Sequence, residues 1–216
     1  MGRFSGIGAA RMRSGRAVLG LGVALLVLAP GCGLFKPTEP ETPRGSVVHT
    51  DYTSASATLA TLARAIQDRG ATTGQSAYLD GLADDFLATH LASVVQRFED
   101  QNRPPPPQWT RNEESRFYAF LTDPNFATGS FTMRWTADDR HADEEIEEAE
   151  RAILARTYSI TRTVNGVPDT LAFGYATLTF RLIPPDKWVV TLWQERDLEP
   201  GDDETLTFSW LRLDSR

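Results

Sequence analysis

The most constraining feature of this sequence is its N-terminus, where an apolar run follows a basic segment. Residues 1–16 contain four arginines and no acid, and Ala17–Ala29 is apolar throughout. A helix of that length, at about 1.5 Å per residue, is too short for a hydrocarbon core of about 30 Å. A basic start, a short apolar core and small residues before a cleavage point are typical of a secretory signal. We therefore interpret residues 1–31 as an export signal, an uncleaved anchor being the alternative.

The signal ends in Leu28-Ala29-Pro30-Gly31-Cys32-Gly33, which contains the only cysteine of the chain. This ending resembles the lipobox of bacterial lipoproteins, in which a cysteine is acylated and then exposed by signal peptidase II. The leucine usual three places before the cysteine is here Ala29. The resemblance implies that Cys32 is the lipid-bearing mature N-terminus, anchored by several acyl chains. Gly33, in place of aspartate, favours the outer membrane where the host has two membranes; an ordinary signal with an incidental cysteine is the alternative.

Composition limits what the mature chain can bind. Removing residues 1–31 leaves 185 residues, enough for one domain, with 18 basic residues against 29 acids and a net charge of −11. An acidic domain is a poor partner for nucleic acid or for an anionic lipid surface. Residues 32–50 carry three prolines and no apolar period. They are predicted to form a tether of up to about 55 Å if extended, followed by a domain over residues 51–216.

The first half of this domain has the apolar spacing of helices. Helices are predicted over residues 53–69, 76–86, 91–98 and 112–121. The segment FLATHLASVV, at residues 86–95, would also suit a strand, because periodicity alone does not decide its type. The proline run at residues 104–107 predicts a stiff surface loop, with a ligand for a proline-recognition groove as the alternative.

From Gly129 onward the apolar period changes to two, which is typical of strands. FTMRW is the first strand, and Asn165-Gly166 is a hairpin turn. AFGYATLTFRL and WVVTLWQE are predicted to form a second hairpin, and TLTFSWLRL a last strand. Residues 143–155 have the composition of a helix but lead directly into strand-like RTYSITRTV, so their type stays open. Helices followed by a meander of antiparallel strands predict an α+β fold.

Several segments resemble the nuclear transport factor 2-like, SnoaL-type domains. TLARAIQDRGATTGQSAYLDGLADDF, at residues 61–86, resembles the opening of these domains. Lys187–Trp193, with Ala176–Leu178 before it, is similar to the family's "dGxWxIxxW" hairpin. Trp109, Arg111 and Glu114 resemble a "W-x-R-x-x-E" helix entry found in bacterial lipoprotein relatives. The resemblance spans residues 53–214 and implies helices packed in a strongly curved antiparallel sheet, a cystatin-like cone around an apolar pocket.

Enzymes of this family move protons with an aspartate or an Asp–His pair in the pocket. Asp84 and Asp85, with Tyr78 nearby, are the candidates for such a role, because a carboxylate buried among aromatic residues has a raised pKa. The alternative is that these acids bind backbone groups or arginines structurally. The three histidines, at positions 49, 90 and 141, lie in no recognisable catalytic segment. We therefore expect a non-enzymatic domain, with a general base aspartate as the alternative.

Two further groups of residues are candidates for binding. Asp138, Asp139, His141 and Asp143 offer oxygen and imidazole ligands of the kind that hard cations bind, but they lack the glycine-containing spacing of a calcium loop, and such charge runs are usually solvated. Trp135, Tyr175 and Trp193 are candidate ligand contacts. If strict alternation holds, Trp188, Val190 and Leu192 share one sheet face and Trp193 lies on the other.

The sequence thus predicts a lipid-anchored protein at the cell or outer membrane, facing the periplasm or the exterior. Its domain is expected to bind a small apolar ligand or a protein of the cell envelope, without a cofactor. Homodimerisation through the outer face of the sheet is compatible with this interpretation. The alternative is a SnoaL-type isomerase, dehydratase or cyclase.

Overall fold

The computed structural model describes residues 47–216 except 124, 127 and 147–149. The export signal, Cys32 and most of the predicted tether lie outside these residues. Within the described part, none of the helices is both long enough and apolar enough to cross a membrane. The chain is already packed at Val48, which is buried and whose amide donates to the Thr73 hydroxyl at 2.9 Å.

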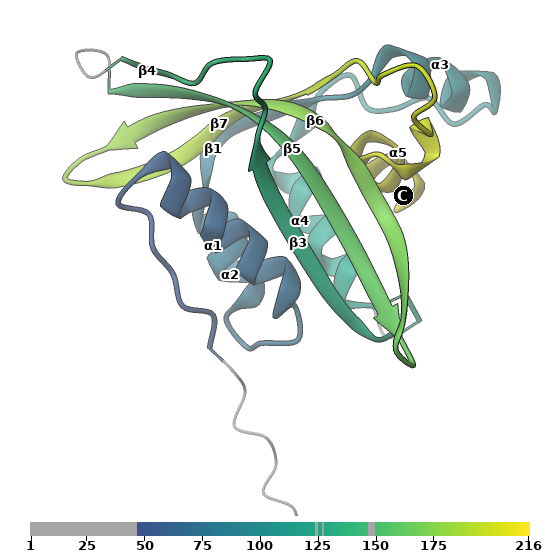
Figure 1. The fold of residues 1–216 in the computed structure, drawn as a ribbon, viewed down its shortest axis with the longest axis horizontal. Helices are drawn as coiled ribbons and strands as arrows, with labels where there is room; N and C mark the ends of the chain where they lie inside the picture. The colour runs from purple at the N-terminus through teal and green to yellow at the C-terminus, as the bar shows by residue number, and fades with distance from the viewer. Residues whose placement is uncertain (1–46, 124, 127, 147–149) are drawn as a thin grey trace, which may run out of the picture. The chain divides into compact units, whose positions relative to one another are not determined.

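The domain combines short helices with one long, curled sheet (Figure 1). The helices are α1 (Ala55–Gln67), α2 (Gly74–Asp80), α3 (Ala92–Asp100), α4 (Arg111–Thr122) and α5 (Phe208–Asp214), with a 3-10 turn η2 at Glu204–Leu206. The strands are β1 (Leu82–Thr89), β2 (Trp109–Thr110), β3 (Ser130–Ala137), β4 (Glu144–Ile146), β5 (Arg151–Val164), β6 (Val167–Ile183) and β7 (Lys187–Arg196). The predicted α+β class is confirmed.

The sheet order is β2-β1-β7-β6-β5-β3, with β4 pairing beside β3 on β5. The pairs are antiparallel except β1 with β7. Helix α1 lies along β3, as Figure 1 shows, and packs with α2 and α4 into one core. Tyr118 on α4 joins these helices: its hydroxyl donates to the carbonyl of Ala65 at 2.8 Å, and its ring centroid is 5.1 Å from that of Tyr78.

The helix predicted over residues 76–86 ends early, at Asp80. Strand β1 begins at Leu82 because its backbone pairs with β7 on one side and β2 on the other. Its pairing with β7 is irregular between Leu82 and Leu87, and this irregularity leaves Asp84 and Asp85 exposed side by side. The helical interpretation of residues 91–98 is confirmed by α3.

Two other segments differ from expectation. Residues 143–155 have a helical composition but form strands: residues 144–146 form β4, and β5 begins at Arg151. Pairing in the sheet buries Ala152 and Leu154. The strand predicted at TLTFSWLRL is instead η2 and α5. The hydroxyl of Thr207 accepts from the amide of Trp210 at 3.1 Å and starts a helix whose buried positions follow helical spacing.

The two predicted hairpins are confirmed, and the first turn has the backbone its sequence indicates. Asn165 and Gly166 have φ values of 53° and 80°, the left-handed conformations of a type I′ turn. Strict alternation in β7 is wrong. Val190 pairs with Phe180 and Leu192 with Thr179, so Thr191 is an extra residue. This bulge places Val190 and Trp193 on the same buried face.

Candidate functional site

The inside of the curled sheet is filled by the protein's own aromatic side chains. Phe208, at the start of α5, has its ring centroid 4.8 Å from that of Tyr158 and 4.7 Å from that of Trp193. Phe117 of α4 closes the same cluster at 5.9 Å from Phe208. Phe208, Phe117 and Trp193 are each 0% exposed. The C-terminal helix therefore occupies the part of the fold where the family resemblance implies an open pocket.

A fully buried ion pair holds α5 in this position. The Glu114 carboxylate of α4 accepts two hydrogen bonds from Arg212 of α5, from Nε and Nη2, each at 2.9 Å, and both side chains are 0% exposed. Tyr78 OH and Trp109 Nε1 donate to the same carboxylate at 2.6 and 2.5 Å. The Arg212 guanidinium also stacks over Trp193, 4.2 Å from the ring centroid. Burial and the Glu114 charge raise the pKa of Tyr78 well above its ordinary value.

A second carboxylate, Glu195 at the end of β7, holds the first turn of the same helix. It accepts from the backbone amide of Ser209 at 2.7 Å, and it also accepts from the hydroxyls of Ser209 and Tyr158. The Tyr158 hydroxyl in turn accepts from the Phe208 amide at 2.9 Å. Burial raises the pKa of the Glu195 carboxyl. The hydrogen bonds from Ser209 and Tyr158 act in the opposite direction and lower this pKa, and they engage the Glu195 oxygens in positioning α5.

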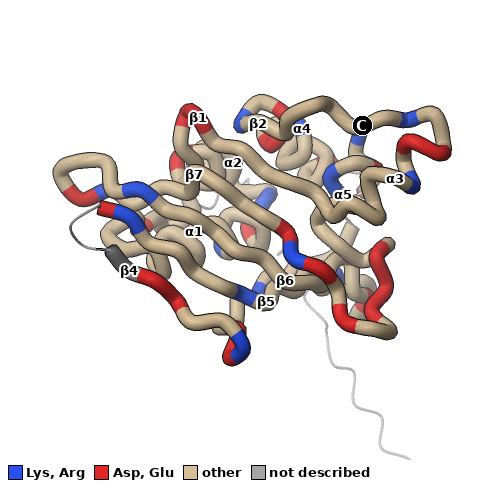
Figure 2. The backbone as a smooth tube through the Cα atoms, turned by 90° about the horizontal axis from the view of Figure 1, so that it is seen from above, with Lys and Arg blue, Asp and Glu red and all other residues tan. Residues whose placement is uncertain are grey.

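The predicted general-base candidates are not brought together. Asp84 has a fully exposed side chain, and Asp85 pairs with Arg181 at 2.8 Å at the surface. Figure 2 shows acidic residues near the β1 label. Hydrogen bonds from Arg181 lower the pKa of Asp85, the opposite of what a base near neutrality requires. Tyr78 lies in the core on Glu114. These contacts correspond to the structural alternative for the two acids.

The predicted acid–histidine cluster is organised around arginines. Asp138 is buried and accepts from Arg140 Nε at 2.9 Å and from Arg196, and His141 Nδ1 lies 3.2 Å from it. Hydrogen bonds from Arg140 hold the pKa of Asp138 well below its usual range. Asp139 is exposed, and Asp143 turns away to Arg156. Among the residues described, no three acids, histidines or cysteines are placed to ligate one metal ion.

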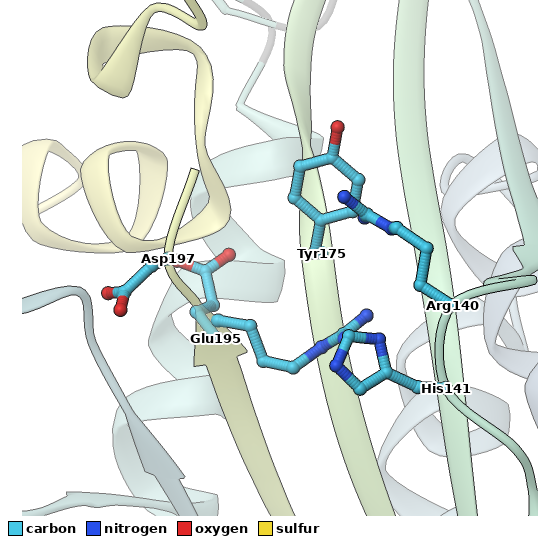
Figure 3. A pocket seen from close by; sticks show the side chains of 6 residues that line it. Arg140, His141, Tyr175, Glu195 and Asp197 are labelled. Carbon is cyan, nitrogen blue, oxygen red and sulfur yellow. The ribbon is translucent and has the colours of Figure 1, made fainter. Parts of the chain in front are cut away.

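Tyr175, a predicted ligand contact, lines a surface pocket of about 390 Å³ at the end of β7 (Figure 3). The guanidinium of Arg140 lies over its ring, 4.5 Å from the centroid, and His141 lines the same pocket next to Arg196. Arg140 is also bound to Asp138 and to Glu199. Arg140, His141 and Arg196 thus share Asp138, and these contacts fasten the segment between β3 and β4 to the end of β7.

A second surface groove, of about 320 Å³, lies between α1 and β3. Its α1 wall consists of Ser56, Leu59, Ala60, Ala63, Arg64 and Gln67. Trp135 of β3 and Arg156 of β5 complete it. Trp135 connects the groove to the core, since its ring centroid is 5.2 Å from that of Trp193, and its buried Nε1 has no partner within the described chain. We call this the α1–β3 groove.

Of its residues, only Trp135 was singled out by the sequence. Arg64 and Arg156 were missed because nothing in the sequence shows that the first helix lies along the edge of the sheet. Trp193, another predicted ligand contact, is completely buried beneath Trp135 and has no access to a ligand in this structure.

No protein-family model and no curated protein matches the chain. Similar solved structures include a protein of unknown function from Mycobacterium tuberculosis, at 9% identity and a TM-score of 0.49, covering 74% of this chain and 87% of that one. Another is an NTF2-like protein with a cystatin-like fold from Novosphingobium aromaticivorans (11% identity, TM-score 0.45, 67% and 79% covered). An NTF2-like superfamily protein from Salmonella enterica is 10% identical with a TM-score of 0.44, and the match covers 67% of this chain and 89% of that one. NTF2-like proteins are thus among the similar folds, as the sequence resemblance predicts.

The first prediction concerns the Glu114–Arg212 pair. Arg212→Met leaves a buried carboxylate without its countercharge and should lower the free energy of unfolding by about 3–5 kcal/mol. The double variant Glu114→Gln/Arg212→Met removes both charges and should be more stable than Arg212→Met alone. The glutamine oxygen can still accept from Trp109, and its NH2 group can donate to the hydroxyl oxygen of Tyr78. Urea unfolding measures both. Arg162→Met, in the partly exposed pair with Asp169, is the control and should cost less than about 1 kcal/mol. A double variant no more stable than Arg212→Met would refute the coupling.

His90 makes the fold sensitive to acid. Its ring packs edge-on against Trp109 with centroids 5.1 Å apart, and neither ring nitrogen has a partner among the described residues. Burial, together with the charges of Arg212 and Arg216, lowers the pKa of His90 to about 3. In the unfolded chain a histidine titrates near 6.5. Protonation below that value therefore favours the unfolded state, and stability is lost as the pH falls from about 6.5 towards 3.

The second prediction follows from this lowered pKa. Between pH 7 and pH 5 the wild-type chain should lose about 2 kcal/mol of unfolding free energy through His90. His90→Phe should remove that part of the loss, whereas His141→Phe, at a histidine with a half-exposed side chain, should keep it. Denaturant unfolding at the two pH values gives the comparison. Equal acid sensitivity of wild type and His90→Phe would contradict the assignment.

Proposed function

We propose that this chain is a lipid-anchored protein of the bacterial cell envelope whose domain binds a small ligand in the α1–β3 groove and catalyses no reaction. The observation that carries the proposal is the groove itself, where Leu59, Ala60 and Trp135 offer an apolar surface next to polar groups. A volume of about 320 Å³ lies at the lower end of the range for small-molecule sites.

The contacts of the acidic side chains favour binding over catalysis. A general base needs a carboxylate that can reach a substrate proton. Glu114 and Glu195 are engaged by donors that hold α5, and Asp85 is engaged by an arginine on the outer surface. The alternative, an isomerase, dehydratase or cyclase with a pocket aspartate, finds no support in the positions of Asp84 and Asp85.

Support for the membrane anchor comes from the sequence. The basic and apolar segments of residues 1–31, followed by the lipobox-like ending at Cys32, are the pattern of a processed lipoprotein. The packed chain begins near Val48, so most of the predicted tether of up to about 55 Å would separate the lipid from the domain. In this arrangement the lipid holds the protein at the envelope while the acidic domain stands off the membrane surface.

The third prediction tests the anchor. Cys32→Ser removes the only thiol that a lipid could modify, so the variant should no longer incorporate labelled palmitate and, because cleavage follows acylation, should keep residues 1–31 and migrate as the larger precursor. Palmitate labelling and gel mobility of the two forms in cells measure the change. Cys32→Ser protein that still incorporates palmitate, or that is cleaved as the wild type is, would overturn the anchor proposal and leave the groove untouched.

The fourth prediction tests the groove. Ala60 is exposed in the middle of α1, and a phenylalanine there would fill the groove without entering the core. Binding of 2-naphthoate or 2-naphthalenemethanol, followed by ligand-observed NMR, should weaken at least tenfold in Ala60→Phe. Ala119→Phe makes the same change at an exposed alanine of α4 outside the groove and should bind as the wild type does. Undiminished binding to Ala60→Phe would place the ligand elsewhere.

A further inference from the structure

We infer that the ligand of the α1–β3 groove is an amphipathic anion, a carboxylate or a similar group on an apolar body, and that Asp143 is a built-in competitor for its charge. The inference rests on the proposed function, because it names the chemical class that the same groove would take. The structural basis is the juxtaposition of Arg156, a groove residue, with a carboxylate supplied by a neighbouring segment.

The groove is a basic site on an acidic protein. The chain has a net charge of −7, yet the groove is lined by two arginines and by no acid. Arg64 has no carboxylate within ion-pair distance in the described chain; its Nη2 donates to the Thr61 hydroxyl at 3.1 Å, and its buried Nε is unpartnered there. Guanidinium groups next to an apolar surface attract an anion more strongly than in bulk water and can bind it through two parallel hydrogen bonds.

Arg156 already holds an anion of the kind that the groove would recognise. Asp143 binds it at both oxygens, Oδ1 with Nη1 at 2.5 Å and Oδ2 with Nη2 at 2.8 Å. Asp143 comes from the segment between β3 and β4 and is not part of the groove lining. It therefore engages the guanidinium as the carboxylate of a bound ligand would.

The two partners differ in how easily they can leave. The Arg156 side chain is 11% exposed, whereas that of Asp143 is 41% exposed, so water can solvate the Asp143 carboxylate when it leaves Arg156. Asp138 anchors the other end of the same segment through Arg140 and Arg196. Displacement of Asp143 thus requires movement of only a few residues. Hydrogen bonds from Arg156 lower the pKa of Asp143, so the competitor is charged at neutral pH.

Competition reduces affinity, because a ligand binds only the fraction of molecules in which Arg156 is available. Asp143→Asn removes the competing charge but keeps a side chain of the same shape. The Ala155 amide, which donates to Asp143 Oδ1 at 3.1 Å, can still donate to the asparagine oxygen. This variant should bind 2-naphthoate about five- to tenfold more tightly than the wild type. Its affinity for uncharged 2-naphthalenemethanol should not change.

The experiment compares both probes by isothermal calorimetry in wild type, Asp143→Asn and Asp169→Asn. Asp169 is a matched control, since it pairs with Arg162 at 2.6 Å between β5 and β6, outside the groove. Arg156→Gln should abolish the preference for the anion. If Asp143→Asn binds 2-naphthoate equally or more weakly, Asp143 is not a competitor but a positioning group, and the inference is wrong. If neither probe binds the wild type or any variant, the proposed function fails first.

A second measurement uses the wild-type chain alone. When 2-naphthoate takes Arg156, Asp143 loses the contacts that lower its pKa, so its titration midpoint should rise towards the ordinary value near 3.9. The carbon-13 resonance of its side-chain carboxyl reports this midpoint, with Asp169 as internal reference. An unchanged Asp143 midpoint at saturating 2-naphthoate would overturn the displacement.

Discussion

The buried pair of Glu114 and Arg212 is the interaction on which the rest of the domain depends. Two charges removed from water each cost several kcal/mol, and hydrogen bonds to their remaining lone pairs and protons offset part of that cost. Among the described residues Arg212 Nη1 has no such partner, so the carboxylate side of the pair is the better satisfied one. Here the carboxylate receives four hydrogen bonds, two of them from Arg212 on a helix 98 residues further along the chain. Such a network tolerates one arrangement of α4 and α5, and that arrangement fills the inside of the sheet. The α1–β3 groove therefore lies outside the closed core, beside α1.

Glu195 shows why a raised pKa alone does not identify a catalytic acid. Buried carboxylates and perturbed pKa values gather at active sites, but structural networks produce the same shift. The donors around Glu195 belong to Ser209 and Tyr158, which position the first turn of α5. The same reasoning applies to Tyr78, whose hydroxyl serves Glu114. In the part of the chain that the structure describes, the buried groups Glu114, Glu195 and Tyr78 are thus each engaged by a structural partner.

The sequence was most reliable where local chemistry determines the backbone. Asn165-Gly166 specified its turn. The helix predicted over residues 112–121 is α4, and a capping box of Thr110 and Glu113, which the prediction did not include, starts it one residue earlier. It was wrong where distant pairing decides: residues 82–86 and 151–155 have helical or ambiguous composition but are strands because neighbouring strands satisfy their backbone. Trp193 was assigned to the wrong face because a one-residue bulge reverses the alternation. Arg64 and Arg156 share no sequence signal, since only the packing of α1 on the sheet brings them together.

Because arginine is the main basic residue of this chain, arginine–carboxylate pairing both stabilises the fold and is the interaction proposed for binding an anionic ligand. Twenty of the 22 basic residues are arginine, whose planar fork fits a carboxylate at two points. What separates a fixed pair from an exchangeable one is the exposure of the acid: the side chain of Glu114 is 0% exposed, that of Asp138 3% and that of Asp143 41%. Exposed acids such as Asp85 and Asp169 also pair with arginine, but their partners line no groove of apolar residues. Arg156 alone among these pairs combines a displaceable acid with an apolar wall, so an incoming anion meets the least resistance there.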